Sequence, residues 1–233
     1  MADRIERDRP LLAVLIDADN LSADHAEAIL REITSIGEPA LRRVYGDWTN
    51  PQLDGWGKKL LSLGLVAVQA TANTKFKNAT DIGLVIDAMD ILHTNRFDGF
   101  VIVSSDSDFT ALANRLREEG KMVISIGEAK TAQSLRNVVN RFILIENLER
   151  ETSENKSAAR NPKEALGLIK NAMNKIDATD DWYSLGAIGQ AIRATHSDFD
   201  PRTYGHEKLS LLMQAIPKLE YRATSHGQVR LKA

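Results

Sequence analysis

Short apolar runs that alternate with helical patterns constrain the fold of this chain more than any other feature. Residues 11–16 (LLAVLI) are continuously apolar and end at Asp17, as in a strand buried on both faces. Similar runs recur at 41–45, 65–69, 100–104, 122–126 and 142–145, and helical patterns at 22–34, 51–63, 81–93 and 108–119 separate most of them. This alternation predicts an α/β fold with a doubly wound parallel sheet and helices on both faces.

The second part of the chain has a different pattern. Residues 149–160 are polar and without apolar periodicity, which is typical of a linker between a domain at 10–148 and one at 161–233. We expect residues 1–9 to be a disordered N-terminal segment. In the second domain, helical patterns at 162–176, 185–194 and 207–215 precede a hairpin pattern at 221–223 and 229–231. Three helices followed by a two-stranded ribbon predict a winged helix.

Composition narrows the chemistry. The chain contains no cysteine, which excludes disulfides and Cys-ligated metal sites, so a metal ion would need oxygen or imidazole ligands. No apolar run is long enough to span a membrane, and the N-terminal segment lacks the apolar core of a signal peptide. We therefore expect a cytoplasmic protein with no membrane partner. Residues 160–233 hold 11 Lys/Arg against 8 Asp/Glu, a net of +3, whereas the rest is acidic. This asymmetry is compatible with a polyanionic partner for the second domain.

Aspartates follow two of the predicted strands at the points where they end. Asp17 follows the first strand, and Asp106 and Asp108 follow the strand at 100–104. Because the carboxyl ends of parallel strands meet at one edge of a sheet, these residues are expected to lie close together. Asp81 opens a helix and can face the same edge.

Carboxylates gathered in this way repel one another, by about 1–4 kcal/mol for two charges at ~4 Å. With no cysteine available, the natural counter-ion is Mg²⁺ or Mn²⁺, which prefer carboxylate and water oxygens. The structural alternative is that these residues are caps, with Asp108 as the N-cap of the helix that follows it.

Three segments resemble the NYN domain, a branch of the PIN-like nuclease superfamily: IDADNL at 16–21, NATDIGLVIDAMD at 78–90 and VIVSSDSDF at 101–109. YGDW at 45–48 and SLRNVVNRFILIE at 134–146 resemble the LabA-like bacterial branch. The resemblance implies a PIN-like fold and a Mg²⁺- or Mn²⁺-dependent ribonuclease. It makes Asp17, Asp81, Asp106 and Asp108 the catalytic, metal-binding acids and Asn20 a polar partner of the site.

The C-terminal half carries a separate resemblance. WYSLGAIGQAI at 182–192 and FDPRTYGHEKLSLLMQAIP at 199–217 are similar to the LOTUS or OST-HTH domain, a winged-helix module associated with RNA. RNA binding is then expected at Arg202, His206, Lys208 and the ribbon around His226 and Arg230.

Further residues are candidates for contact with RNA. Ser104 and Ser105 stand at a strand end beside the acids. Lys75 and Lys77 flank Phe76 just before Asp81, where they could hold phosphates while the ring stacks on a base. Trp48 and Trp56 could form a stacking platform, although tryptophans that pack helices are commoner.

Other functions stay open at this point. Asp17-Ala18-Asp19 has the aspartate spacing of haloacid dehalogenase phosphatases, and Ser104 could be their strand-end hydroxyl, but Leu21 departs from that pattern and Asp81 has no role in it. The other alternative is an RNA-binding or regulatory protein with a weak or inactive site. Several further questions also stay open: the RNA target, the choice between RNA and DNA, endo- or exonuclease action, the number of metal ions (one or two), and assembly into a homo-oligomer.

Overall fold

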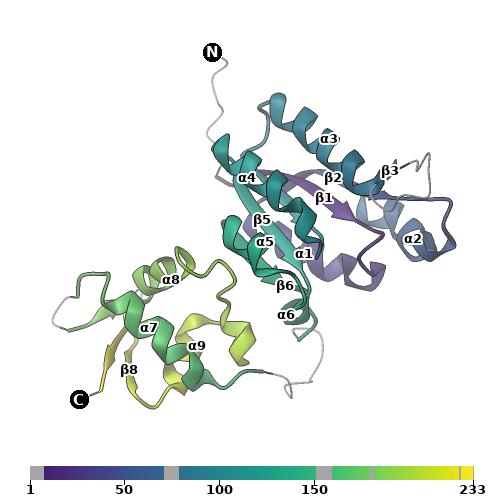
Figure 1. The fold of residues 1–233 in the computed structure, drawn as a ribbon. Helices are drawn as coiled ribbons and strands as arrows, with labels where there is room; N and C mark the ends of the chain where they lie inside the picture. Colours follow the sequence, from purple (N-terminus) through teal and green to yellow (C-terminus); the bar gives the residue numbers. More distant parts are fainter. Residues whose placement is uncertain (1–7, 71–78, 151–158, 179–180, 226, 233) are drawn as a thin grey trace. The chain divides into compact units, whose positions relative to one another are not determined.

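A computed structural model describes residues 8–70, 79–150, 159–178, 181–225 and 227–232 (Figure 1). The chain divides into two compact units, Met1–Glu149 and Arg150–Ala233. Unit 1 contains a six-stranded sheet in the order β3-β2-β1-β4-β5-β6, in which every pair of neighbours is parallel. Its strands are β1 (Leu11–Asp17), β2 (Glu38–Gly46), β3 (Val66–Gln69), β4 (Gly99–Val103), β5 (Met122–Gly127) and β6 (Arg141–Leu144). The predicted α/β fold with a doubly wound parallel sheet is confirmed.

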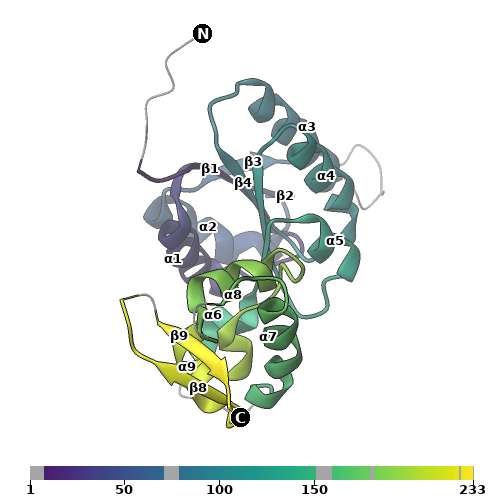
Figure 2. The ribbon, with the colours of Figure 1, turned by 90° about the vertical axis from the view of Figure 1, so that its left-hand side faces the viewer.

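Helices cover both faces of this sheet. The α-helices are α1 (Ala26–Ile36), α2 (Asp54–Leu63), α3 (Ala79–His93), α4 (Thr110–Glu118), α5 (Gln133–Val138) and α6 (Ile145–Arg150). Figure 2 shows α1 and α2 on one side of the sheet and α3, α4 and α5 on the other. The short helices α5 and α6 have no counterpart in the predicted pattern.

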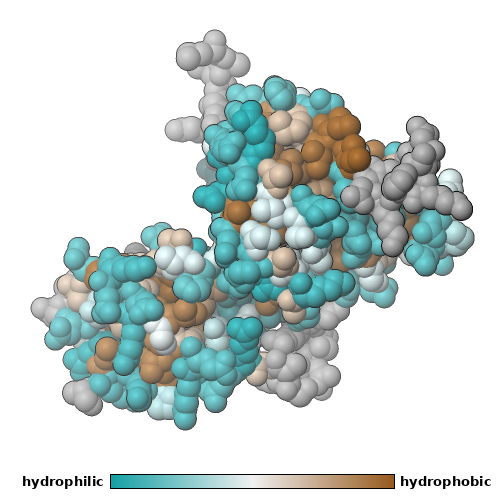
Figure 3. All heavy atoms as spheres, in the orientation of Figure 1, coloured by the Kyte–Doolittle hydropathy of each residue, from teal (hydrophilic) through white to brown (hydrophobic). Residues whose placement is uncertain are grey.

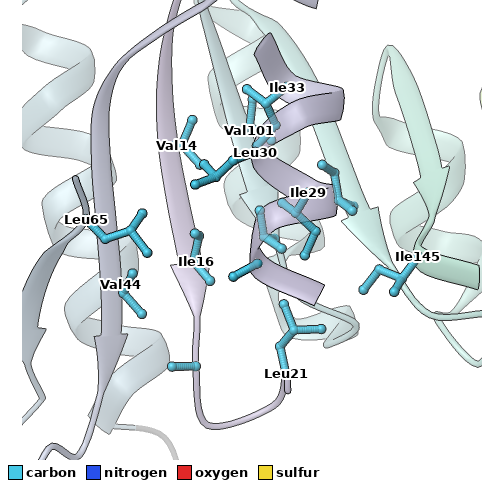
Figure 4. Packing of buried hydrophobic residues seen from close by; sticks show 14 of the residues in the cluster. Val14, Ile16, Leu21, Ile29, Leu30, Ile33, Val44, Leu65, Val101 and Ile145 are labelled. Carbon is cyan, nitrogen blue, oxygen red and sulfur yellow. The ribbon is translucent and has the colours of Figure 1, made fainter. Parts of the chain in front are cut away.

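Side chains of β1 alternate between two buried clusters. Val14 and Ile16 pack with Ile29 and Ile33 of α1 on one face (Figure 4). Ala13 and Leu15 pack on the other face with Leu84 of α3. All seven residues of β1 are buried. The continuous apolar run therefore reflects a central strand that is covered on both sides.

Helix ends follow local signals. Ser22 caps the 3₁₀ turn η1 (Ala23–His25) before α1, because its side chain accepts a hydrogen bond from the Asp24 amide. Gly64 ends α2 with φ of 61°, a left-handed conformation that favours glycine. The 3₁₀ turn η2 (Pro51–Leu53) begins on a proline, as the sequence predicts.

The sheet order reverses at its centre. From β1 the chain moves outward to β2 and β3, and then crosses to β4 on the other side of β1 before continuing to β5 and β6. In open α/β sheets, ligands bind beyond the carboxyl ends of the strands at such a switch point. Here that place lies at the ends of β1 and β4, at Asp17 and after Val103, so the topology places the expected ligand site beside the aspartates there.

In its described residues, unit 2 contains three α-helices and a small sheet. Its α-helices are α7 (Leu166–Met173), α8 (Leu185–Arg193) and α9 (Leu209–Ala215). Strand β9 (Gln228–Leu231) pairs antiparallel with both β7 (Tyr183–Ser184) and β8 (Leu219–Arg222). The sheet therefore has a third strand that the sequence pattern does not predict. A strand of two residues is too short to show an alternation of apolar and polar residues.

Candidate functional site

Asp17 is the buried centre of the site. It is the last residue of β1 and has no exposed surface. Its Oδ2 atom accepts hydrogen bonds from Asn20 Nδ2 at 2.9 Å and Ser104 Oγ at 2.8 Å. Its Oδ1 atom is buried without a hydrogen-bond partner among the described residues. Burial raises the pKa of this carboxyl above its usual value, against the opposing effect of hydrogen bonding by Asn20 and Ser104.

Two serines after β4 hold the surrounding loops in place. Ser104 Oγ donates to Asp17 and accepts from the Asp106 amide at 3.1 Å, which joins the ends of β1 and β4. Ser105 Oγ accepts from the Glu128 amide at 2.9 Å, at the end of β5. Ser104 is fully buried. Both hydroxyls thus have bonds within the protein.

Asp106 and Asp108 lie on the next turn. Asp106 is the N-cap of the 3₁₀ turn η3 (Ser107–Phe109), because its Oδ1 accepts from the Asp108 amide at 2.9 Å. The alternative in which Asp108 caps this helix is therefore wrong. The capping site lies two residues earlier because a 3₁₀ turn precedes α4, and the Asp108 residue stays exposed.

The pKa of Asp81 is affected by the charges of all these aspartates. Asp81 lies in the first turn of α3, as predicted. Burial, together with the negative charges of Asp17, Asp106, Asp108 and Asp19, raises its pKa to about 6. Asp81 is thus within electrostatic reach of the other three predicted acids. In the parts of the chain that the structure describes, however, no three acidic or histidine side chains are close enough together to hold an ion.

Asp19, which the sequence singles out only for its phosphatase-like spacing, also lies at this site. Its Oδ2 accepts a hydrogen bond of 2.6 Å from Thr80 Oγ1, and Thr80 is buried immediately before Asp81. Gly46 at the end of β2 allows the close approach, because a Cβ there would lie 3.3 Å from Asp19 Oδ1 and 2.5 Å from Leu53 Cδ1. The Asp19–Thr80 bond fixes the start of α3 against the loop after β1.

A second attachment of α3 involves Asp87. Its two carboxylate oxygens accept hydrogen bonds from Arg43 and from the Tyr45 hydroxyl, both on β2. Tyr45 is fully buried, and burial together with this carboxylate raises the pKa of its phenol. Asp87 therefore ties the middle of α3 to the sheet.

An apolar hollow adjoins the acids. Its volume is about 240 Å³, and it is lined by Asp81, Asp108, Ile82, Val85, Ile86 and Phe109. Ile82 and Ile86 are 59% and 58% exposed, which is high for isoleucine on a folded domain. The space-filling view shows this apolar surface over α3 (Figure 3). Acidic and apolar groups thus face the same space.

Comparison with known proteins gives two family matches along the chain. The model of the NYN domain matches residues 11–146, which is more than half of the sequence. The chain belongs to the NYN domain family. The model of the OST-HTH/LOTUS domain matches residues 157–231, in the predicted order. NYN domains are part of the PIN-like nuclease superfamily, whose members typically use divalent metal ions.

The other comparisons concern curated proteins and solved structures. No curated protein matches the chain. A crystal structure of a protein of unknown function from Vibrio parahaemolyticus is similar, with a TM-score of 0.50 and 20% sequence identity. The match covers 60% of this chain and 96% of the Vibrio protein, and at 20% identity it supports the fold alone. None of the helices in the described residues is long and apolar enough to cross a membrane.

The two tryptophan candidates of the NYN domain differ in burial. Trp56 is fully buried, and its indole N–H donates to the Leu21 carbonyl at 2.9 Å, so the predicted platform role of Trp56 is wrong. Trp48 is half-buried and donates to the Val68 carbonyl at 3.0 Å. Lys75 and Lys77 lie outside the described residues.

The candidate RNA contacts in the OST-HTH/LOTUS domain differ in their surroundings. Arg202 is mostly buried, with 10% of its side chain exposed, and forms an ion pair of 2.7 Å with Asp200. Its backbone amide also donates to Asp200, the N-cap of the turn η6 (Pro201–Tyr204). Lys208 is exposed and His206 is half-exposed. The charge of Arg202 therefore has a partner within the domain, whereas Lys208 is open to solvent.

Proposed function

We propose that the protein is a metal-dependent ribonuclease whose NYN domain hydrolyses phosphodiester bonds and whose OST-HTH/LOTUS domain binds the RNA. The observation that carries this proposal is the buried, unpartnered Oδ1 atom of Asp17 among further carboxylates at the switch point of the sheet. A buried carboxylate oxygen without a donor is costly unless a cation takes the place of that donor. Hard oxygen ligands suit Mg²⁺ or Mn²⁺.

The residues of the chain have separable roles in this proposal. Asp17, Asp81, Asp106 and Asp108 would have to close around the ion, because as described no three of them are near enough to share it. The ion would then supply an activated water and stabilise charge on the phosphoryl oxygens. Asn20 and Ser104 orient the Asp17 carboxylate through their hydrogen bonds to Oδ2, while Oδ1 has no hydrogen-bond partner among the described residues. Asp19 and Thr80 position Asp81 at the start of α3.

The apolar hollow beside the acids suits an unpaired nucleobase. Ile82 and Ile86 offer a surface without donors or acceptors, so a base would be accepted whatever its identity. A duplex keeps its bases stacked within the helix and cannot present one there. The proposed substrate is therefore single-stranded RNA, or an unpaired stretch of a structured RNA.

We expect Ile86→Ala to lower kcat/KM for single-stranded RNA roughly fivefold, because the smaller side chain gives up about 1 kcal/mol of apolar packing against the base. Val66→Ala is the matched control, since Val66 is also 58% exposed but lies on β3, outside the hollow. Initial rates with a labelled oligonucleotide measure both variants. Equal rates for both would show that the base does not use this surface.

A second candidate function is that of an RNA-binding protein with an inactive NYN site. It is favoured by the spread of the acids, because no three of them in the described residues are close enough to share an ion. Asp106 also serves as a cap. The aspartyl-phosphatase alternative gains no support, because Asp19, which it would need as an acid, is bonded to Thr80.

The deciding experiment is incubation of the full chain with end-labelled single-stranded RNA in Mn²⁺ or Mg²⁺ and in chelator. Ribonuclease function predicts fragments that appear with metal and disappear with chelator, because the ion supplies the nucleophile. RNA that is bound but remains intact in either ion would establish the second candidate. Hydrolysis of a small phosphate monoester without cleavage of RNA would instead favour a phosphatase.

A further inference from the structure

Trp182 has an unusual position in the OST-HTH/LOTUS domain. It directly precedes β7, and it is only 9% exposed. The residues that form the hydrophobic core of this unit, as far as it is described, do not include it. Its ring is instead covered by two guanidinium groups, with Cζ of Arg222 at 4.3 Å and Cζ of Arg230 at 4.7 Å from the ring centroid.

The strand register explains this arrangement. In β8 and β9, Tyr221 pairs with Val229, and the two arginines lie on either side of that pair. Val229 is fully buried and faces the core. Because side chains alternate along a strand, Arg222 and Arg230 project together from the opposite face. Trp182 therefore lies on the outer face of the small sheet, beneath charged groups.

The positive charge on this face is only partly balanced. Arg230 Nε donates to Glu220 Oε2 at 2.8 Å, in a pair whose side chains are both more than 40% exposed. Arg222 donates to the neutral side chain of Gln228, at 3.1 Å from its Nε, and has no acidic partner among the described residues. Two cations with one exposed counter-charge leave a site that attracts an anion.

Stacking on an indole also prepares the arginines for such a ligand. A guanidinium group that lies over a ring keeps its N–H groups in its own plane, and the N–H groups not bonded to Gln228 or Glu220 can donate to phosphate oxygens. The ring limits the rotamers of both side chains, so less conformational entropy is lost when they bind. An outer face that served only to cover Trp182 would not need two positively charged side chains over the same ring.

We propose that Trp182, Arg222 and Arg230 form the site where the OST-HTH/LOTUS domain binds the backbone phosphates of RNA. The inference rests on the proposed RNA-binding function of this domain and adds to it the residues and the chemistry of the contact. Trp182 is a positioning residue in this site, and Glu220 competes with phosphate for Arg230.

The test is binding of a fluorescent single-stranded RNA to the full chain, in chelator so that no cleavage occurs, over a range of salt concentrations. Arg222→Gln with Arg230→Gln should weaken binding at least about tenfold and flatten the slope of log Kd against log salt by about 1.4, or roughly 0.7 for each phosphate that is no longer neutralised. Glu220→Gln should act in the opposite direction and tighten binding about two- to fivefold. Trp182→Leu should weaken binding but keep most of the salt slope, because both charges remain.

Lys163→Gln with Lys170→Gln is the matched control, since it removes two exposed charges near and on α7. If the arginine pair and the lysine pair have the same effect, or if Glu220→Gln weakens binding, the proposed site is overturned while RNA binding stands. If the parent chain does not bind RNA even at low salt, both this site and the RNA-binding function of the domain are overturned. Thermal melts of each variant distinguish weaker RNA binding from unfolding of the domain.

Discussion

Replacing Asp106 by Asn is expected to reduce RNA cleavage by at least about 100-fold while leaving the fold intact. Asparagine is as good an N-cap as aspartate, so its Oδ1 can still accept from the Asp108 amide. The substitution removes one negative charge from the cluster around Asp81. A bound ion contributes several kcal/mol to the transition state, and ~3 kcal/mol corresponds to about 100-fold in rate.

Asp90→Asn provides the control for this experiment. It removes the same charge from an exposed position on α3, nine residues beyond Asp81. Single-turnover cleavage with excess enzyme compares the two variants with the parent. If Asp106→Asn cleaves within a few-fold of Asp90→Asn, then Asp106 does not hold the ion and the ribonuclease site must be assigned to other residues.

Much of the NYN domain follows from its sequence because β1 and β4, at the centre of its sheet, are continuous apolar runs. The run at 11–16 and the strand β1 agree to within one residue, since a central strand buried on both faces leaves no room for polar positions. Strands nearer the edge are less regular. β2 begins at Glu38, three residues before the apolar pattern does, because its first residues pair with β1 while some of their side chains stay exposed.

Hydrogen bonds and ion pairs between polar side chains could not be predicted in the same way. Nothing in the sequence indicates that Asp87 bonds to Tyr45, or that Asp19 bonds to Thr80, because both contacts join segments distant along the chain. The charge of Arg202 alone predicts contact with RNA, whereas its pairing with Asp200 depends on the turn between them. Trp182 carries no signal in the sequence, since its two arginines come from other strands.

The charge of Asp81 should make the metal-free protein less stable as pH rises. Its pKa is about 6 in the folded protein against a usual value of 3.8. A carboxyl whose pKa is raised by folding binds its proton more tightly in the folded state. Its contribution to stability is therefore fully present below about pH 4 and is lost as pH rises through about 6. Above that range the ionised side chain faces burial and the neighbouring aspartates without compensation.

Asp81→Asn should remove this dependence. At about pH 8 in chelator, the variant is expected to be more stable than the parent by about 1–2 kcal/mol, a value reduced from the full shift because Asp81 is partly exposed. That corresponds to a rise in Tm of roughly 3–6 °C. At about pH 4 the advantage should nearly vanish, because the parent carboxyl is then protonated.

Divalent ions should reverse the order of the two proteins. A ligand that binds only the folded state stabilises it in proportion to occupancy, so millimolar Mg²⁺ or Mn²⁺ should raise the Tm of the parent and raise that of Asp81→Asn much less. Thermal melts of both proteins at the two pH values, each with chelator and with metal, test the whole set. A parent whose Tm ignores the ions, together with an Asn variant that gains nothing at about pH 8, would mean that the aspartates act as caps and tethers and that the NYN domain functions without a metal centre.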